Sequence, residues 1–178
     1  MYPEYIQVNN RKYKINTDYK IALSCFKAIE DEEISDLERA YAILTLLLGK
    51  NVLPEDEEEA LKKCAIFLRC GKEENQEIEE VDFDYEADSS YIMASFRSDY
   101  HIDLIKEDMH WYLYNELIQG LTPNCILNKI RELRNFDVDE IQNEKEKEKI
   151  IKAKERIALK PKYTSEEKQL ISEFDSLF

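Results

Sequence analysis

The residues best suited to chemistry are two histidines, His101 and His110, which lie among acidic residues. Their neighbours in sequence include three aspartates, Asp99, Asp103 and Asp108. Imidazole and carboxylate groups together can bind a divalent metal ion or act as acid and base. On one continuous helix, however, the two rings would lie about 13 Å apart along the axis, because each residue rises 1.5 Å. A shared site therefore needs a chain reversal near Ile102, and we favour a half-buried or interface position for His110, beside Trp111.

Other reactive groups give weaker indications of catalysis. Acidic clusters occur at residues 55–59 and at Asp82, Asp84, Glu86 and Asp88. Catalytic carboxylates need a concave site that shifts their pKa values, whereas consecutive acids at a helix start or in a linker are mostly solvated. Cys125 could have a lowered pKa at a predicted helix start, but we favour a small core residue. No GxGxxG, GxxxxGK[ST] or HExxH motif occurs. The sequence predicts a protein that is not an enzyme and has no cofactor and no metal site.

Aromatic residues between Asp82 and Leu121 predict two amphipathic helices with a broad aromatic face. Apolar residues recur at helical spacing in two blocks, separated by residues 100–102. The second block contains Trp-Tyr-Leu-Tyr at residues 111–114, so this helix has apolar surface on three sides. Such a helix either lies at the centre of a bundle, which we favour, or presents one flank to a partner. The candidate partner-binding residues are Tyr91, Tyr100, Trp111, Tyr112 and Tyr114.

The same region resembles the bacteriophage gp-fifteen family, whose members are small proteins of long-tailed phages and prophages. The resemblance lies in the runs DYEADSSYIMASFRSDYHIDL and MHWYLYNELIQGL, and the stretches KINTDYKIAL and NKIREL fit the same family. It extends over most of the chain, to about Arg134. The resemblance implies a role in tail morphogenesis similar to that of the tail assembly chaperones, whose genes lie next to that of the tape-measure protein. It implies no catalytic residues.

The N-terminal half must form elements that support this aromatic region. Residues 5–15 predict a β-hairpin with an asparagine pair in its turn, which must pack on helices or pair with another chain. A helix capped by Thr17 or Asp18 follows, and Ser35 or Asp36 begins a second helix, which Gly49 ends. Pro54 begins a third, which ends at Gly71. The predicted core stripe of the second helix consists of Leu37, Ala40, Tyr41, Leu44, Leu47 and Leu48.

The next segments complete a helical domain predicted over residues 1–135. Residues 72–82 are acidic and without periodicity, which indicates a surface linker before the aromatic helical pair at residues 83–121. Thr122 and Pro123 then begin a further helix. Its core stripe is Ile126, Leu127, Ile130 and Leu133.

Residues 136–178 predict a charged helical arm that ends in an amphipathic peptide. Asp137 and Glu140 suggest a capping box for a helix that is polar on every face from 142 to 149, where EKEKEK offers ion pairs. We expect this helix to project into solvent or span a gap. The last segment, SEEKQLISEFDSLF, needs an apolar groove, for which we favour a second copy or another protein. Its candidate self-association residues are Leu170, Ile171, Phe174, Leu177 and Phe178.

Composition excludes several function classes. The net charge of −14 and a pI near 4.7 argue against direct binding of nucleic acid, whose phosphates need basic residues. Four scattered cysteines and the lack of an apolar signal segment predict a reducing cytoplasm. The longest mostly apolar run, at residues 40–48, is too short to span a bilayer, so we expect no membrane role.

Together these patterns predict a mainly α protein: a small helical bundle domain with an N-terminal β-hairpin and a protruding C-terminal helical arm. The functional hypothesis, which depends mainly on the resemblance, is a tail assembly chaperone that forms homo-oligomers and covers the apolar faces of the tape-measure protein, in the host cytoplasm. The tail tube protein is a further partner to expect. One alternative is an acidic nucleic-acid mimic that binds a basic site on a host protein. The other is a metal-dependent hydrolase that uses His101.

Overall fold

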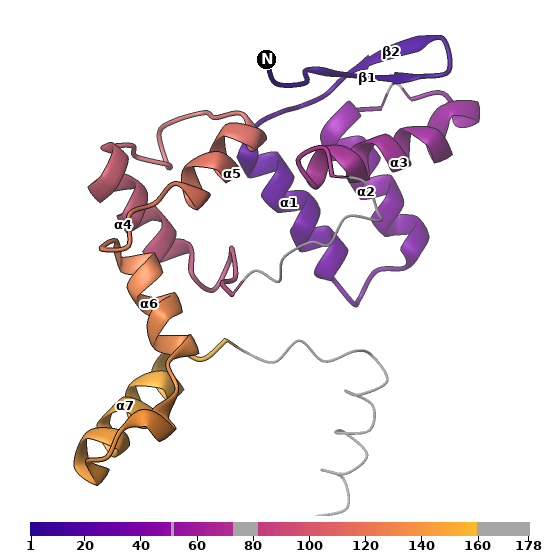
Figure 1. Ribbon diagram of the computed structural model, residues 1–178. Helices are drawn as coiled ribbons and strands as arrows, with labels where there is room; N and C mark the ends of the chain where they lie inside the picture. Colours follow the sequence, from indigo (N-terminus) through magenta and orange to yellow (C-terminus); the bar gives the residue numbers. More distant parts are fainter. Residues whose placement is uncertain (51, 73–81, 160–178) are drawn as a thin grey trace, which may run out of the picture. The chain divides into compact units, whose positions relative to one another are not determined.

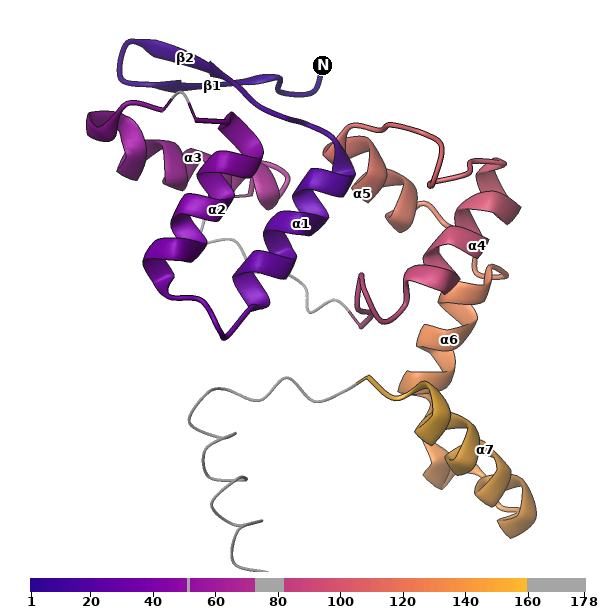
Figure 2. The same cartoon turned by 180° about the vertical axis from the view of Figure 1, so that it is seen from behind.

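A computed structural model describes residues 1–50, 52–72 and 82–159 of the 178-residue chain (Figures 1 and 2). The chain is mainly helical with one antiparallel hairpin, which confirms the predicted fold class. It divides into two compact units, Met1–Asn128 and Lys129–Phe178. The described elements are β1 (Tyr5–Val8), β2 (Arg11–Lys14), α1 (Tyr19–Glu30), α2 (Asp36–Leu48), the 3-10 helix η1 (Pro54–Asp56), α3 (Glu57–Leu68), α4 (Ser89–Tyr100), α5 (Trp111–Gln119), α6 (Ile126–Asn135), the 3-10 helix η2 (Val138–Glu140) and α7 (Glu144–Ile157).

The N-terminal hairpin forms as predicted and packs on α3. Val8 pairs with Arg11 across the turn, and Asn9 adopts a left-handed φ of 51°, which asparagine tolerates better than most residues. Ile6 and Val8 are buried, whereas their neighbours in β1 are exposed. The hairpin is therefore held by one apolar face on the helices, which an isolated two-stranded ribbon lacks.

Local capping chemistry sets the ends of the first helices. Asp18 accepts a hydrogen bond from the Lys20 N–H (2.8 Å) at the start of α1, and Ser35 forms a capping box with Glu38 at the start of α2. Gly49 ends α2 with a φ of 75°. Of the alternative caps that the sequence offers, the structure selects Asp18 and Ser35.

A short antiparallel bridge joins the starts of α1 and α5. The Tyr19 N–H donates to the Met109 carbonyl (2.9 Å), and the Trp111 N–H donates to the Thr17 carbonyl (2.7 Å). These two backbone bonds fix α5 against α1, and both views show the two helices side by side (Figures 1 and 2). Residues 101–110 make this pairing possible, because they bring the chain from the end of α4 to the start of α1.

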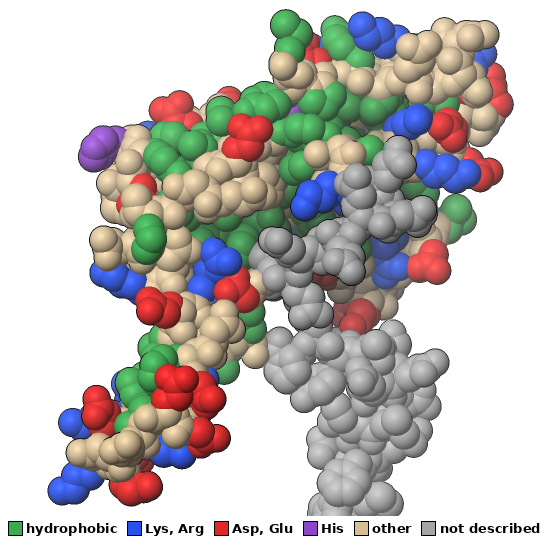
Figure 3. Space-filling model, viewed as in Figure 1, with side chains coloured by type: hydrophobic (Ala, Val, Ile, Leu, Met, Phe, Trp, Pro, Cys, Tyr) green, Lys and Arg blue, Asp and Glu red, His purple; other side chains and the backbone are tan. Residues whose placement is uncertain are grey.

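The core of the first unit draws on the hairpin and on all helices from α1 to α6. In Figure 3, hydrophobic side chains also gather at the surface of this unit, in the middle of the face that is drawn, with charged side chains among and around them. Its fully buried side chains include Val8, Leu47, Ile92, Phe96, Trp111, Tyr114 and Leu127. One continuous core therefore connects the N-terminal hairpin with the aromatic helices.

The predicted core stripe of α2 is wrong for two residues. Leu37 is 81% exposed and Tyr41 is 63% exposed. All four buried side chains of α2 lie between Ile43 and Leu48. Helical periodicity gives the direction of a side chain around the axis, but not how far along the axis a neighbour covers it. The first two turns of α2 extend beyond the packed region on this face.

The second unit begins within α6 and contains α7, which packs against η2. Lys154 donates to the Phe136 carbonyl (2.6 Å) just after α6, and Arg134 donates to the Ile157 carbonyl (2.7 Å) at the end of α7. Cationic side chains therefore satisfy carbonyl groups at the C-terminal ends of α6 and α7. Among the described residues 129–159, no side chain is buried. This unit therefore has little core of its own in the part of the chain that the structure describes.

The predicted capping box at Asp137 does not begin the arm helix. Asp137 accepts from the Asp139 N–H and caps only η2. The helix begins at Glu144, where Asn143 accepts from the N–H groups of both Lys145 and Glu146. Both caps are therefore formed, and α7 begins after Asn143 because its side chain satisfies two of the free N–H groups at that helix start.

Two predicted segments lie largely or wholly outside the described residues: the acidic linker at 72–82, of which 73–81 are not described, and the amphipathic peptide with Leu170, Ile171, Phe174, Leu177 and Phe178. Within the described part, none of the helices combines the length and the apolar character needed to cross a membrane.

Candidate partner-binding surface

Two of the five candidate aromatic residues are core residues. Trp111 is 1% exposed and donates its indole N–H to the Leu68 carbonyl (2.9 Å). Tyr114 is 2% exposed, and its ring centroid lies 4.4 Å from that of Tyr19 in a stacked pair. Their assignment as partner-binding residues is therefore corrected, because neither side chain is accessible in the folded chain. The central position that we favoured for this helix is the one observed.

The other three candidates are half-buried. Tyr112 stacks on Phe67 with the ring centroids 5.4 Å apart, and burial raises the pKa of Tyr112 to about 12. Tyr100 donates its hydroxyl to the Leu117 carbonyl (2.9 Å). Tyr91 lies on α4. A role of these three tyrosines in partner binding stays a prediction.

The two histidines occupy different structural positions. His110 caps α5: its Nδ1 accepts from the Tyr112 N–H (3.1 Å), and its Nε2 lies 3.1 Å from the Pro3 carbonyl. Tyr2 stacks on the same ring. His101 is exposed and ends α4 with a left-handed φ of 57°. Within the described ranges, no three His, Cys, Asp or Glu side chains come together as a metal site requires.

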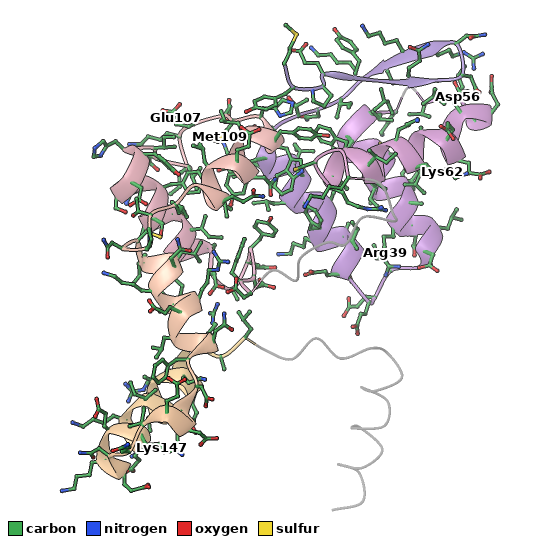
Figure 4. All side chains as sticks on the ribbon, viewed as in Figure 1. Arg39, Asp56, Lys62, Glu107, Met109 and Lys147 are labelled. Atoms are coloured by element: carbon green, nitrogen blue, oxygen red, sulfur yellow. The ribbon has the colours of Figure 1, made fainter. Side chains whose placement is uncertain are left out.

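Asp56 is the exception in the acidic run at residues 55–59, because its side chain is completely buried. It accepts hydrogen bonds from Tyr13 (2.6 Å), Arg11 (2.9 Å) and Asn9 (2.7 Å), all of which come from the hairpin (Figure 4). These donors hold the pKa of Asp56 at about 2, with the Tyr13 hydroxyl as the largest contribution. The expectation of solvated carboxylates is wrong for Asp56, which joins the hairpin to the start of α3.

Other reactive groups also have structural roles. Asp88 is buried before α4, where it accepts from the Asp84 N–H (3.0 Å). Cys125 is buried, as favoured, and its sulfur accepts from the Asn128 N–H (3.4 Å). These side chains act within the fold, and none of them faces an open site.

Among the described residues of the first unit, and apart from the chain start, the most exposed apolar residues are Leu37 (81%), Tyr41 (63%) and Ile105 (69%). Leu37 and Tyr41 lie one turn apart on α2, and we call this pair the α2 surface. Residues 30–41, around the α2 surface, contain six acids and one basic residue, a net charge of −5. Ile105 lies elsewhere, in the loop between α4 and α5. The sequence signal for this surface was the acidic run directly before an apolar stripe.

The net negative charge comes from one part of the chain. Residues 1–128 contain 13 Lys and Arg against 27 Asp and Glu, a net charge of −14. Residues 129–159 contain 9 against 8, a net charge of +1. Residues 160–178 contain 3 against 4, so residues 129–178 have no net charge and the first unit carries the entire net charge of the protein.

Comparison with known families gives a match that covers most of the chain. The family described as Bacteriophage Gp15 protein matches residues 2–159. No curated protein and no solved structure matches the chain significantly.

Proposed function

Because the chain belongs to the bacteriophage Gp15 protein family, we propose that it is a tail morphogenesis protein that acts as a tail assembly chaperone. Copies of the chain associate with one another and cover the apolar faces of the helical tape-measure protein in the host cytoplasm. They leave when the tail tube forms around the tape measure. Binding is helix against helix, with affinity from many weak sites that act together.

The observation that carries this proposal is the family match over residues 2–159. The charge distribution supports it, because a net charge of −14 on the first unit would keep a coated apolar protein in solution. Exposed apolar side chains on α2 also suit a protein that binds other proteins.

The second unit supports self-association. Its described residues contain no buried side chain, and small structures without a core gain stability from oligomerisation. Its net charge of +1 over residues 129–159 also offers little electrostatic resistance to contact between copies.

Light scattering after size exclusion tests the proposal. We expect the full chain to form oligomers and to co-elute with a co-expressed tape-measure protein from the same genome. A truncation that ends at Leu159 removes the five apolar residues Leu170, Ile171, Phe174, Leu177 and Phe178, and we expect it to shift toward monomer. A strict monomer that does not co-elute with the tape measure would contradict the chaperone role.

The net charge of −14 on residues 1–128 also favours a second candidate, an acidic mimic that binds a nucleic-acid site on a host protein. Such binding should collapse between about 50 and 200 mM salt, as phosphate contacts do. Apolar contact with a tape-measure helix should be far less sensitive to salt, since screening acts on charges. Repeating the co-elution at both salt concentrations separates the two functions.

A further inference from the structure

We propose that the α2 surface, formed by Leu37 and Tyr41, is the docking site for an amphipathic helix with an apolar stripe flanked by Lys or Arg. This inference rests on the proposed function, from which the expectation of a helical partner comes. It adds the position of the site and the charge that the partner must carry.

The α2 surface is the uncovered end of a stripe that is core elsewhere. Leu37 and Tyr41 are four residues apart, so both side chains lie on one face of α2. Leu44 and Leu48 continue the same face and are buried. A helix laid against Leu37 and Tyr41 would therefore extend the helical packing of the first unit by one further contact, with no rearrangement of the core.

The α2 surface is held rigidly before any partner binds. The capping box of Ser35 and Glu38 fixes the first turn of α2. Arg39 connects this turn to the end of α1, since its guanidinium donates to the carbonyls of Ala28 (3.2 Å), Asp31 (2.7 Å) and Ile34 (3.3 Å) (Figure 4). A preorganised surface loses less conformational entropy on binding than a frayed helix end would.

The charge beside the α2 surface selects a basic partner. Six acids occur within residues 30–38, namely Glu30, Asp31, Glu32, Glu33, Asp36 and Glu38. The nearest basic residue, Arg39, is committed to backbone carbonyls and to Asp36. Lys or Arg on the flanks of a docked helix would be attracted, whereas a second copy would bring another unit with a net charge of −14.

Substitution at the α2 surface can be separated from loss of folding. Leu37 and Tyr41 are largely exposed, and substitutions of exposed side chains usually change stability by about 0.5 kcal/mol or less. The double variant Leu37→Ser with Tyr41→Ser should therefore fold with a melting temperature close to that of the unsubstituted chain. Ile105→Ser is the matched control, because it removes an apolar side chain of similar exposure away from the acidic run.

The probe is a labelled helical peptide of Leu, Ala and Lys, of about 20 residues, titrated with the full chain by fluorescence anisotropy. We expect the double variant to bind at least about tenfold more weakly, and Ile105→Ser to bind within about twofold of the unsubstituted chain. A peptide with the same apolar stripe and Glu in place of Lys should not bind. Equal binding by the double variant would show that attraction to the acidic unit is non-specific and would overturn the α2 surface, as would equal binding of the Glu peptide.

Co-elution with the tape-measure protein separates this inference from the proposed function. If the unsubstituted chain does not co-elute with the tape measure, the chaperone function fails, whatever the peptide result. If it co-elutes and the double variant co-elutes equally well, the function stands and the α2 surface is overturned. If the double variant instead converts an oligomer to monomer, the occupant is a second copy, which contradicts the basic partner.

Discussion

Replacement of Trp111 by alanine should reduce the free energy of unfolding by about 3 to 5 kcal/mol, which is the usual cost of truncating a buried tryptophan. The Trp111 ring is almost completely buried and lies against Phe26, Tyr85 and Tyr114, with centroid separations of 5.5, 6.0 and 5.8 Å. Alanine would leave a cavity among these rings and would remove the indole N–H that the Leu68 carbonyl accepts. Because a domain is typically stable by about 5 to 15 kcal/mol, this variant should lie near the limit of folding.

The measurement is urea denaturation followed by far-UV circular dichroism, since the substitution removes the only tryptophan of the chain. Trp111→Phe is the control: it keeps most of the ring volume and should cost about 1 to 3 kcal/mol, mainly for the lost hydrogen bond and the smaller ring. Trp111→Phe should also keep the binding of a basic helical peptide, because Trp111 lies in the core. A denaturation midpoint for Trp111→Ala equal to that of the unsubstituted chain would contradict the central position of α5.

Elements that depend on local chemistry were predictable from the sequence. The asparagine turn at residues 9–10, the cap at Ser35 and the stop at Gly49 each involve groups within four residues of one another, so the deciding interactions are visible in the sequence itself. The buried face of α5 was also predictable, because Trp111, Tyr114 and Ile118 follow helical spacing.

Features that depend on distant parts of the chain were not predictable. Whether Tyr41 is covered depends on where the neighbours of α2 end, and helical spacing contains no such information. Asp56 looks like its acidic neighbours in sequence, and only the docked hairpin, more than 40 residues earlier, distinguishes it. The exposure of the α2 surface and the hydrogen bonds that join Asp56 to the hairpin both depend on such distant contacts.

Replacement of Asp56 by asparagine should lower the melting temperature by about 5 to 10 °C, through the loss of charged hydrogen bonds in a buried position. The Asp56 carboxylate accepts from three donors, Tyr13, Arg11 and Asn9. An asparagine amide has nearly the same shape, but its NH2 group would face donors and would leave at least one of them unpaired. Glu58→Gln is the matched control in the same acidic run, because Glu58 is exposed and pairs with Lys62, four residues on. It should change the melting temperature by about 1 °C or less.

Lowering the pH should reduce the difference in melting temperature between the unsubstituted chain and the Asp56→Asn variant. The pKa of Asp56 is lowered from 3.8 to about 2 in the folded chain, so the unfolded chain binds a proton at higher pH than the folded chain does. The stability that the carboxylate contributes is therefore complete above about pH 5, and it declines as the pH falls through 3.8 toward 2. Asparagine does not titrate, so the gap between the melting temperatures of the two proteins should be largest at pH 7 and should narrow by pH 3. A difference in melting temperature that stays constant from pH 7 to pH 3 would show that the charge of Asp56 does not stabilise the hairpin. Packing alone would then join the hairpin to α3.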